Sequence, residues 1–332
     1  MKHFQVVLGA ILAASTLATA GHVAPGEANK TRLAFVVLVR PGQERDAALL
    51  TDSIHDFAGD AAGAPVYAVL TDPANTAGTL LKSRGARVTP LEMDERFRRY
   101  PYADKVWACE QVERLVGKDA DLLVWVFPAS IVVAPLRELD LAPEQAAAFR
   151  PVHIQLAGLS YGSPPDAFWE GIYKATGLTV DQAFPVETLT QGAKIHAYFN
   201  SGFFAVRPQL GLMRAWRENF EKLLLDGDFQ AKACSDLQHK LYLHQAVLAA
   251  VVARLGRDRI HLLPSTYSYP VSLHNKVVPE HRAKNANSLV EMSSDTTLRD
   301  ARWMDELPVE EPLKSWLLKR LQGEPAPVAQ GR

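Results

Sequence analysis

Cysteine is nearly absent from this sequence, because only Cys109 and Cys234 occur among its 332 residues. So few thiols exclude a metal site built from a cluster of cysteines. The two residues could form one disulfide in an exported protein. Cys109 also falls in a helical pattern with Val106 and Val112, where a buried free thiol fits equally well. The sequence leaves both possibilities open.

Excess charge of either sign is also missing. The chain has 36 Lys and Arg residues against 37 Asp and Glu, a net charge of -1, and no run of basic residues stands out. Without a positive field, the chain is not expected to bind nucleic acid or an anionic membrane. The glycine-rich sequences GxGxxG and GxxxxGK[ST] are absent as well, so any nucleotide site needs a different architecture.

Long apolar runs are confined to the N-terminus. A Lys-His pair precedes an apolar stretch over 4–17, and Ala18-Thr19-Ala20 supplies the small residues of a signal-peptide cleavage site. The stretch is short for a membrane span, so cleavage is expected over retention as an anchor. We therefore expect a signal peptide at 1–20, a flexible leader at 21–31 and export to the periplasm or beyond. No stable membrane span is expected after cleavage.

The rest of the composition is that of an ordinary globular protein, with 48% hydrophobic and 22% charged residues. The first half alternates apolar strand-like runs with helical patterns, joined by short connections. This alternation predicts an α/β fold with a mostly parallel central sheet flanked by helices. The expected strands are 33–40, 65–70 and 86–88, and the expected helices are 43–57, 76–83 and 104–116.

The stretch DLLVWVFPASIVVAPL, residues 121–136, is the expected centre of that sheet. Its unbroken apolar run at 122–126 favours a strand buried on both faces, and Pro128 then removes a ladder donor and ends it. Ligands of open α/β sheets bind at the carboxyl ends of central strands. The turn 127–130 is therefore a candidate ligand site, although a plain core strand with its turn explains the pattern equally well.

The second half contains a strong strand-like segment that is interrupted by small polar residues. Asn200-Ser201-Gly202 stands between two aromatic runs, which predicts a bulge or the close approach of a ligand, unless the glycine serves packing alone. Other strand-like runs and helical patterns surround this segment. The expected strands are 149–154 and 260–264, and the expected helices are 166–175, 210–225, 236–255 and 312–321.

Taken in order, five segments resemble the GT-A fold of nucleotide-sugar glycosyltransferases, most closely glycosyltransferase family 8 and its bacterial relatives. The segments are LAFVVLVR, YPYADKVWACEQVE, VWVFPASIVVAPLREL, YFNSGFFAVRP and LHQAVL. The resemblance implies a GT-A-like domain at 32–281, followed by a C-terminal extension with a terminal helix at 282–322. The composition of 323–332 is that of a disordered tail.

The resemblance also implies that a metal site has been lost. In the family, the strand-turn carries an Asp-x-Asp pair that grips a divalent cation, which bridges the diphosphate of the donor. Phe127 and Ala129 stand at the two acidic positions here. Ser130, the nearest oxygen ligand, is a poor substitute for a charged pair. No metal and no other cofactor is therefore expected.

Two residues of LHQAVL are the expected catalytic pair. His244 replaces the family's usual Asp before Gln245. A histidine there could act as a base or hold a hydroxyl, because its pKa lies near neutrality, or it could be a hydrogen-bonded core residue.

The resemblance places the remaining substrate contacts as follows. Lys105 suits pairing with donor phosphate, unless it is a lysine on the helix surface, and Arg40 could face a phosphate or simply end a strand in solvent. Asn200, Ser201 and Gly202 match the lining of the sugar pocket. His274 resembles a family histidine that helps to hold metal or diphosphate.

Two functions remain open. The first is hexosyl transfer without metal, from a nucleotide-linked or lipid-linked donor to a glycan. The second is a non-catalytic carbohydrate-binding or envelope-assembly protein, because export would separate the chain from cytoplasmic nucleotide sugars. For the second, six aromatic residues would suit stacking on sugar rings, unless they are core: Tyr102, Tyr161, Trp169, Tyr198, Tyr267 and Tyr269.

A hydrolase acting through paired carboxylates finds less support. Such an enzyme needs two acidic groups that converge on one bond. The pairs Glu110/Glu113 and Asp305/Glu306 show no sign of convergence, and we interpret them as solvated faces.

Overall fold

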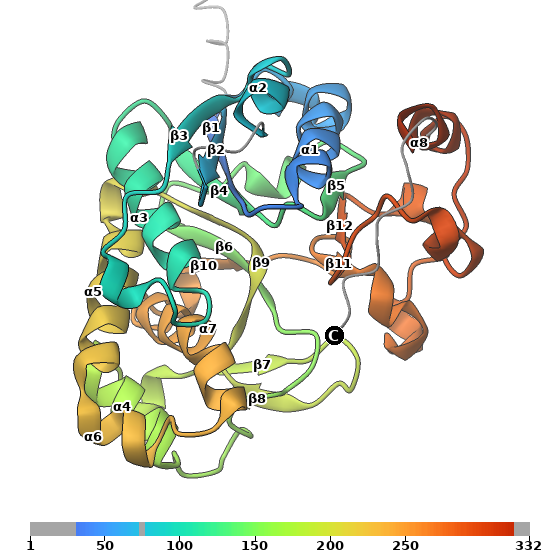
Figure 1. Ribbon diagram of the computed structural model, residues 1–332. Helices are drawn as coiled ribbons and strands as arrows, with labels where there is room; N and C mark the ends of the chain where they lie inside the picture. The colour runs from blue at the N-terminus through green and yellow to red at the C-terminus, as the bar shows by residue number, and fades with distance from the viewer. Residues whose placement is uncertain (1–30, 73–76, 322–332) are drawn as a thin grey trace, which may run out of the picture. The chain divides into compact units, whose positions relative to one another are not determined.

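The structure, a computed structural model, describes residues 31–72 and 77–321 (Figure 1). The expected signal peptide and the expected disordered tail lie outside the described residues, as does the expected leader except for Thr31. Within this part of the chain, no helix is both long and apolar enough to cross a membrane.

The core of the fold is a seven-stranded sheet in the order β10-β6-β9-β4-β1-β2-β3. All neighbouring strands are parallel except at β9, which runs antiparallel to both β4 and β6. The predicted α/β fold with a mostly parallel central sheet is therefore confirmed. The strands are β1 (Leu33–Val39), β2 (Val66–Leu70), β3 (Arg87–Pro90), β4 (Leu122–Val126), β6 (Ala147–Pro151), β9 (Phe199–Val206) and β10 (Ile260–Leu262).

The unbroken apolar strands are explained by burial on both faces of this sheet. In β1, Phe35 and Val37 enter one hydrophobic cluster, whereas Val36 and Leu38 enter the other. β4 follows the same pattern and is fully buried, as its apolar run predicts. The predicted strand at 149–154 lies earlier in the structure, since β6 begins at Ala147 and ends at Pro151, which has no donor with which to continue the ladder.

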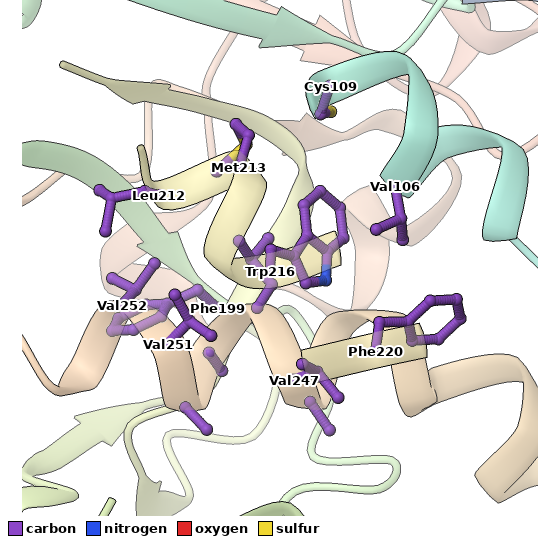
Figure 2. Packing of buried hydrophobic residues seen from close by; sticks show 14 of the residues in the cluster. Val106, Cys109, Phe199, Leu212, Met213, Trp216, Phe220, Val247, Val251 and Val252 are labelled. Carbon is purple, nitrogen blue, oxygen red and sulfur yellow. The ribbon is translucent and has the colours of Figure 1, made fainter. Parts of the chain in front are cut away.

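Helices cover the two faces of the sheet (Figure 1). One face packs against α3, α4, α5 and α7, and the other packs against α1 and α2. Figure 2 shows Trp216 and Phe220 of α5 between Val106 of α3 and Val247 of α7. The helices are α1 (Glu44–Phe57), α2 (Ala77–Lys82), α3 (Ala103–Val116), α4 (Ala167–Thr176), α5 (Leu212–Leu225), α6 (Gly227–Lys232), α7 (Leu237–Ala253) and α8 (Leu313–Leu321).

Two smaller sheets complete the fold. The strand after the β4 turn, β5 (Ser130–Val132), leaves the large sheet and pairs with β12 (Glu291–Ser293), which in turn pairs with β11 (Tyr269–Pro270). β7 (Pro185–Glu187) and β8 (Lys194–His196) form a separate hairpin pair. The C-terminal segment thus contributes a strand directly beside the predicted ligand turn.

The C-terminal helix α8 packs on α1. The Trp316 ring lies edge-on to Phe57 with centroids 5.0 Å apart, and its indole nitrogen donates to Asp56 over 2.6 Å. The Arg320 guanidinium bonds the same carboxylate over 2.6 Å. These contacts couple the last described helix to the first.

Both cysteines are buried and free, which answers the question that the sequence leaves open. Cys109 lies in α3 with 1% of its surface exposed, as the helical pattern around it predicts for a core thiol. The Cys234 sulfur lies 3.3 Å from the Tyr100 hydroxyl. No disulfide therefore joins α3 to the segment before α7.

Glu113 corrects one sequence interpretation. It is buried rather than solvated, and its carboxylate accepts from the backbone N–H groups of Met213 and Arg214, each over 2.9 Å. Met213 and Arg214 lie in the first turn of α5. The residue before this helix is Gly211, which has no side chain to cap the helix. Glu113 therefore supplies the cap from α3, since helix N-termini leave N–H groups without partners.

Candidate active site

The predicted ligand turn after β4 is held by backbone bonds from two directions. The Phe127 N–H donates to the Gly202 carbonyl over 2.8 Å, which ties the turn to β9. The Ser294 N–H donates to the Ala129 carbonyl over 3.0 Å, which ties it to the C-terminal segment. Ser130 begins β5 and is 1% exposed. The turn therefore lies between β9 and the residues that follow β12.

The predicted bulge at Asn200-Ser201-Gly202 is confirmed. In the pairing of β9 with β6, Phe149 is opposite Phe204 and Pro151 is opposite Phe199. Four residues of β9 therefore stand opposite the single β6 residue between them, Arg150. The Asn200 side-chain oxygen accepts from the Gly202 N–H over 2.5 Å. A β-carbon at position 202 would lie 2.9 Å from that oxygen, so any other residue there would displace the Asn200 side chain from its bond to the backbone.

A buried polar network joins this bulge to α7. The Ser201 hydroxyl donates to the Gln245 side-chain oxygen over 3.0 Å and lies 3.3 Å from His244 Nε2. His244 Nδ1 lies 2.9 Å from the Leu241 carbonyl, which can only accept, so the ring proton sits on Nδ1. Burial, aided by the nearby Lys105 ammonium, holds the pKa of His244 well below its usual value. His244 is therefore neutral, and Nε2 carries a free lone pair.

Lys105 is enclosed beneath the same network. Its side chain is 6% exposed, so the alternative of a surface lysine is wrong. Its Nζ donates to the Ser201 carbonyl and lies 5.1 Å from the centre of the Trp125 ring. Burial lowers the pKa of Lys105 to about 7. Lys105 thus joins α3 to β9 and titrates near neutral pH.

Arg40 and Tyr102 complete the cluster. The Arg40 guanidinium makes a two-pronged ion pair with Asp104, at 2.6 and 2.8 Å, and lies 5.6 Å from the centre of the Tyr102 ring. Burial opposes the charge of Arg40, but the Asp104 carboxylate outweighs it and raises the pKa. The Tyr102 ring in turn stacks on His244. The end of β1, the start of α3 and the middle of α7 therefore meet here.

His274 lies in a different environment. It belongs to a short 3-10 helix, Val271–Lys276, and its Nδ1 is hydrogen-bonded to the Tyr269 hydroxyl over 2.7 Å. Burial lowers the pKa of His274. No described contact joins it to His244, Ser201 or Lys105. The structure thus brings most of the expected residues together and places His274 in the C-terminal cluster.

The residues at the turn do not fit a divalent metal ion. Phe127 and Ala129, which the resemblance aligns with the acidic pair, are apolar, and Ser130 offers one enclosed hydroxyl. Glu291 lies on β12, the strand that pairs with β5, and one of its oxygens accepts from the Ser268 N–H over 2.7 Å. Hard cations take several oxygen ligands, with carboxylates foremost. We therefore derive no catalytic step through a metal.

The six aromatic residues expected to stack on sugars divide into two groups. Tyr102 and Tyr161 are 40% and 47% exposed. The other four are corrected to core residues, each no more than 2% exposed, because their rings fill the interior between helices and sheet: Trp169, Tyr198, Tyr267 and Tyr269. Only the exposed pair retains the geometry for stacking on a ligand.

A cavity of about 530 Å³ lies elsewhere, between α1, α2 and α8. Its basic side chains are largely ion-paired, since Arg84 bonds Asp52 over 3.1 Å and Arg320 bonds Asp56 over 2.6 Å. None of the expected site residues lines it. The lining residues are Arg45, Ala48, Leu49, Asp52, Leu80, Arg84, Arg299, Lys319, Arg320 and Leu321.

Sequence reasoning missed four polar residues around the site. Asp104, Glu291, Arg150 and His153 became visible only when distant segments met. Arg150 has a signal in the sequence, because a lone charge in the apolar run AAFRP is unusual for a buried strand. The others carry no such signal.

The mostly parallel sheet, its antiparallel strand β9 and the polar cluster at the bulge belong to a glycosyltransferase domain. The chain belongs to the family of the Rhodobacterales glycosyltransferase domain, whose model matches residues 34–256. No curated protein sequence matches it.

Three solved glycosyltransferase structures are similar to this chain at low identity. The galactosyltransferase LgtC, in complex with donor and acceptor sugar analogs, is 11% identical, with a TM-score of 0.45 over 86% of this chain and 99% of that one. Mouse xyloside xylosyltransferase 1 is 12% identical, with a TM-score of 0.44 over 80% and 98%. The glycosyltransferase GlyE of Streptococcus pneumoniae TIGR4 is 12% identical, with a TM-score of 0.47 over 89% and 61%. We take no residue role from them.

Proposed function

We propose that this glycosyltransferase-family chain transfers a sugar from an activated donor to a glycan acceptor without a divalent metal ion. The observation that carries the proposal is the joining of Lys105, Ser201, His244 and Gln245 in one buried network at the end of β4. Buried ionisable groups with shifted pKa values, such as Lys105 and His244, concentrate at functional sites. Metal independence is supported by the apolar residues at positions 127 and 129.

In this proposal His244 acts on the acceptor. Its Nε2 lone pair is free to accept a proton from a hydroxyl, because Nδ1 holds the ring proton toward the Leu241 carbonyl. Its lowered pKa keeps the imidazole neutral at physiological pH. The Ser201 hydroxyl donates to the Gln245 side-chain oxygen, which fixes both side chains, and in this proposal the pair orients hydroxyls of a sugar bound beside the network.

Arg40 and Lys105 supply positive charge for the leaving group. Basic side chains can stabilise a diphosphate in place of a metal. The two-pronged ion pair with Asp104 already orients the Arg40 guanidinium, and a diphosphate would compete with Asp104 for it. Lys105, with a pKa of about 7, would be held in its charged form by a nearby anion.

Export, proposed from residues 1–20, bears on the donor. The signal-like pattern supports delivery to the periplasm. Nucleotide sugars are made in the cytoplasm, so an exported transferase would use a lipid-linked donor with the same diphosphate chemistry. Arg40 and Lys105 suit either donor, because both face the diphosphate rather than the carrier.

The test is a thermal-shift screen of the chain from Gly21 onward against nucleotide sugars and a lipid-linked sugar diphosphate, with manganese or with EDTA. Binding to the native state raises the melting temperature by mass action. We expect one donor to shift it equally with manganese and with EDTA, and Lys105→Met to lose that shift. A shift that needs manganese refutes metal independence. No shift with any donor, together with binding of free oligosaccharides, would refute the transferase proposal and indicate a carbohydrate-binding protein.

A further inference from the structure

Arg150 is a buried cation without a partner. It lies in β6, opposite the bulge of β9, and only 6% of its surface is exposed. Its Nε is fully enclosed and makes no hydrogen bond. Across residues 31–72 and 77–321, no carboxylate pairs with its guanidinium and no carbonyl accepts from it.

Such an arrangement is costly. A buried charge is ordinarily paired and hydrogen-bonded, because removing it from water costs several kcal/mol. Burial alone lowers the pKa of Arg150 to about 10, so the side chain remains charged at neutral pH. The fold therefore holds a largely buried positive charge that no carboxylate of the described residues compensates. A ligand anion would offset that cost.

His153 adds a second donor without a partner. The Asn200 amide is oriented by the bond from the Gly202 N–H to its oxygen, so its nitrogen faces His153 Nε2 over 2.8 Å. That nitrogen donates, and Nε2 therefore accepts, which leaves the ring proton on Nδ1. Nδ1 is enclosed and has no acceptor. Burial and the charge of Arg150 lower the pKa of His153 to about 3, which keeps the ring neutral. Both residues meet the bulge of β9, Arg150 as the residue opposite it and His153 through Asn200.

The place of this pair in the sheet puts it beside the bulge of β9. Arg150 lies opposite that bulge, and His153 contacts Asn200 within it. Arg40 follows β1, which is three strand positions from β6. The bulge is the part of the site assigned to the sugar, so we assign the anion that meets Arg150 to the sugar rather than to its leaving group.

We propose that Arg150 and His153 bind the carboxylate of an acidic sugar, such as a uronate. The inference rests on the proposed function, since it names the sugar class of the same site. The guanidinium meets a carboxylate with two parallel N–H bonds, and the His153 Nδ1–H supplies a third donor. A neutral sugar would leave these N–H donors without an acceptor, so we expect the site to bind neutral sugars more weakly than acidic ones.

The test compares matched acidic and neutral sugars on the full chain. UDP-glucuronate against UDP-glucose probes a carboxylate on the donor, and methyl glucuronide against methyl glucoside probes one on the acceptor. Titration calorimetry should show tighter binding of the acidic member in one of the two pairs, by roughly tenfold or more. Arg150→Met should remove that preference and leave the neutral sugar bound as before. Arg259→Met, at an exposed arginine, is the matched control and should keep the preference.

Stability gives an independent readout. Because Arg150→Met removes an unpaired buried charge, its melting temperature should equal or exceed that of the wild type. A structural arginine would instead lower it. Equal binding of acidic and neutral sugars by the wild type overturns the carboxylate site while the transferase proposal stands, and this comparison needs no variant. Absence of binding by all four sugars overturns the carboxylate site, and the thermal-shift screen with the lipid-linked donor then decides the transferase proposal separately.

Discussion

The Tyr102 ring stacks on the His244 ring, with centroids 4.5 Å apart and planes inclined by 27°. Tyr102 is 40% exposed and His244 is 3% exposed, so the tyrosine covers the histidine. Tyr102 holds a left-handed backbone conformation, with φ of 60°, at the start of α3. Non-glycine residues adopt this conformation only where their surroundings impose it. The stack therefore fixes the environment of the proposed base.

The first prediction concerns that cover. Tyr102→Ala should expose the imidazole and raise the pKa of His244 toward its ordinary value, because burial is the largest cause of its depression. Titration of the ring by NMR measures the change. Tyr102→Phe keeps the stack and should leave the pKa as it is. An unchanged pKa in the alanine variant would show that the burial comes from other neighbours.

The second prediction is a pH dependence of donor binding. Lys105 has a pKa of about 7, and a bound anion favours its charged form. Below pH 7 the ammonium is already charged, whereas above pH 7 binding must take up a proton. Affinity for a diphosphate donor should therefore fall as the pH rises above 7, by up to about tenfold per unit. Calorimetry in buffers of different ionisation enthalpy measures the proton uptake.

The matched control for that experiment is Lys105→Met. It removes the titrating group and keeps the apolar stem against Trp125, so its remaining affinity should vary little between pH 6 and 9. A wild-type affinity that is constant over the same range would contradict the assigned role of Lys105.

The third prediction concerns the cap on α5. Glu113→Ala should destabilise the fold by about 1–3 kcal/mol, because two N–H groups lose a buried charged acceptor. Chemical denaturation measures the loss. Glu110→Ala, one turn away and only weakly paired with Arg114 at 3.8 Å, should cost less than about 0.5 kcal/mol. Equal losses in the two variants would argue against the cap.

The fourth prediction concerns Glu291. Burial raises its pKa to about 7 in the folded chain, compared with about 4.3 in an unfolded one. Between these values the folded state keeps a proton that the unfolded state has released, so the contribution to stability is full below pH 4 and falls as the pH rises to 7. Glu291→Gln should flatten this part of the stability profile. Parallel profiles for both proteins would place the titration in another group.

Much of the scaffold could be predicted from the residues themselves. The run at 122–126 reads as a doubly buried strand, Pro128 marks its end, and the Asn-Ser-Gly interruption marks the bulge of β9. These features depend on neighbours within a few residues of each other. Side-chain periodicity and the conformational limits of proline and glycine are local properties, and they survive in any tertiary context.

The sequence by itself determined the alternating α/β pattern, the family resemblance and the apolar character of Phe127 and Ala129, where the resemblance expects an acidic pair. The tertiary structure decided which charges meet. Arg40 finds Asp104 across 64 positions, and Lys105 reaches Ser201 across 96. Their pKa values follow from burial and from such partners, which depend on strand order and helix packing rather than on adjacent residues. For the same reason, only the fold could show that Arg150 lies opposite a bulge and that no carboxylate of the described residues pairs with it.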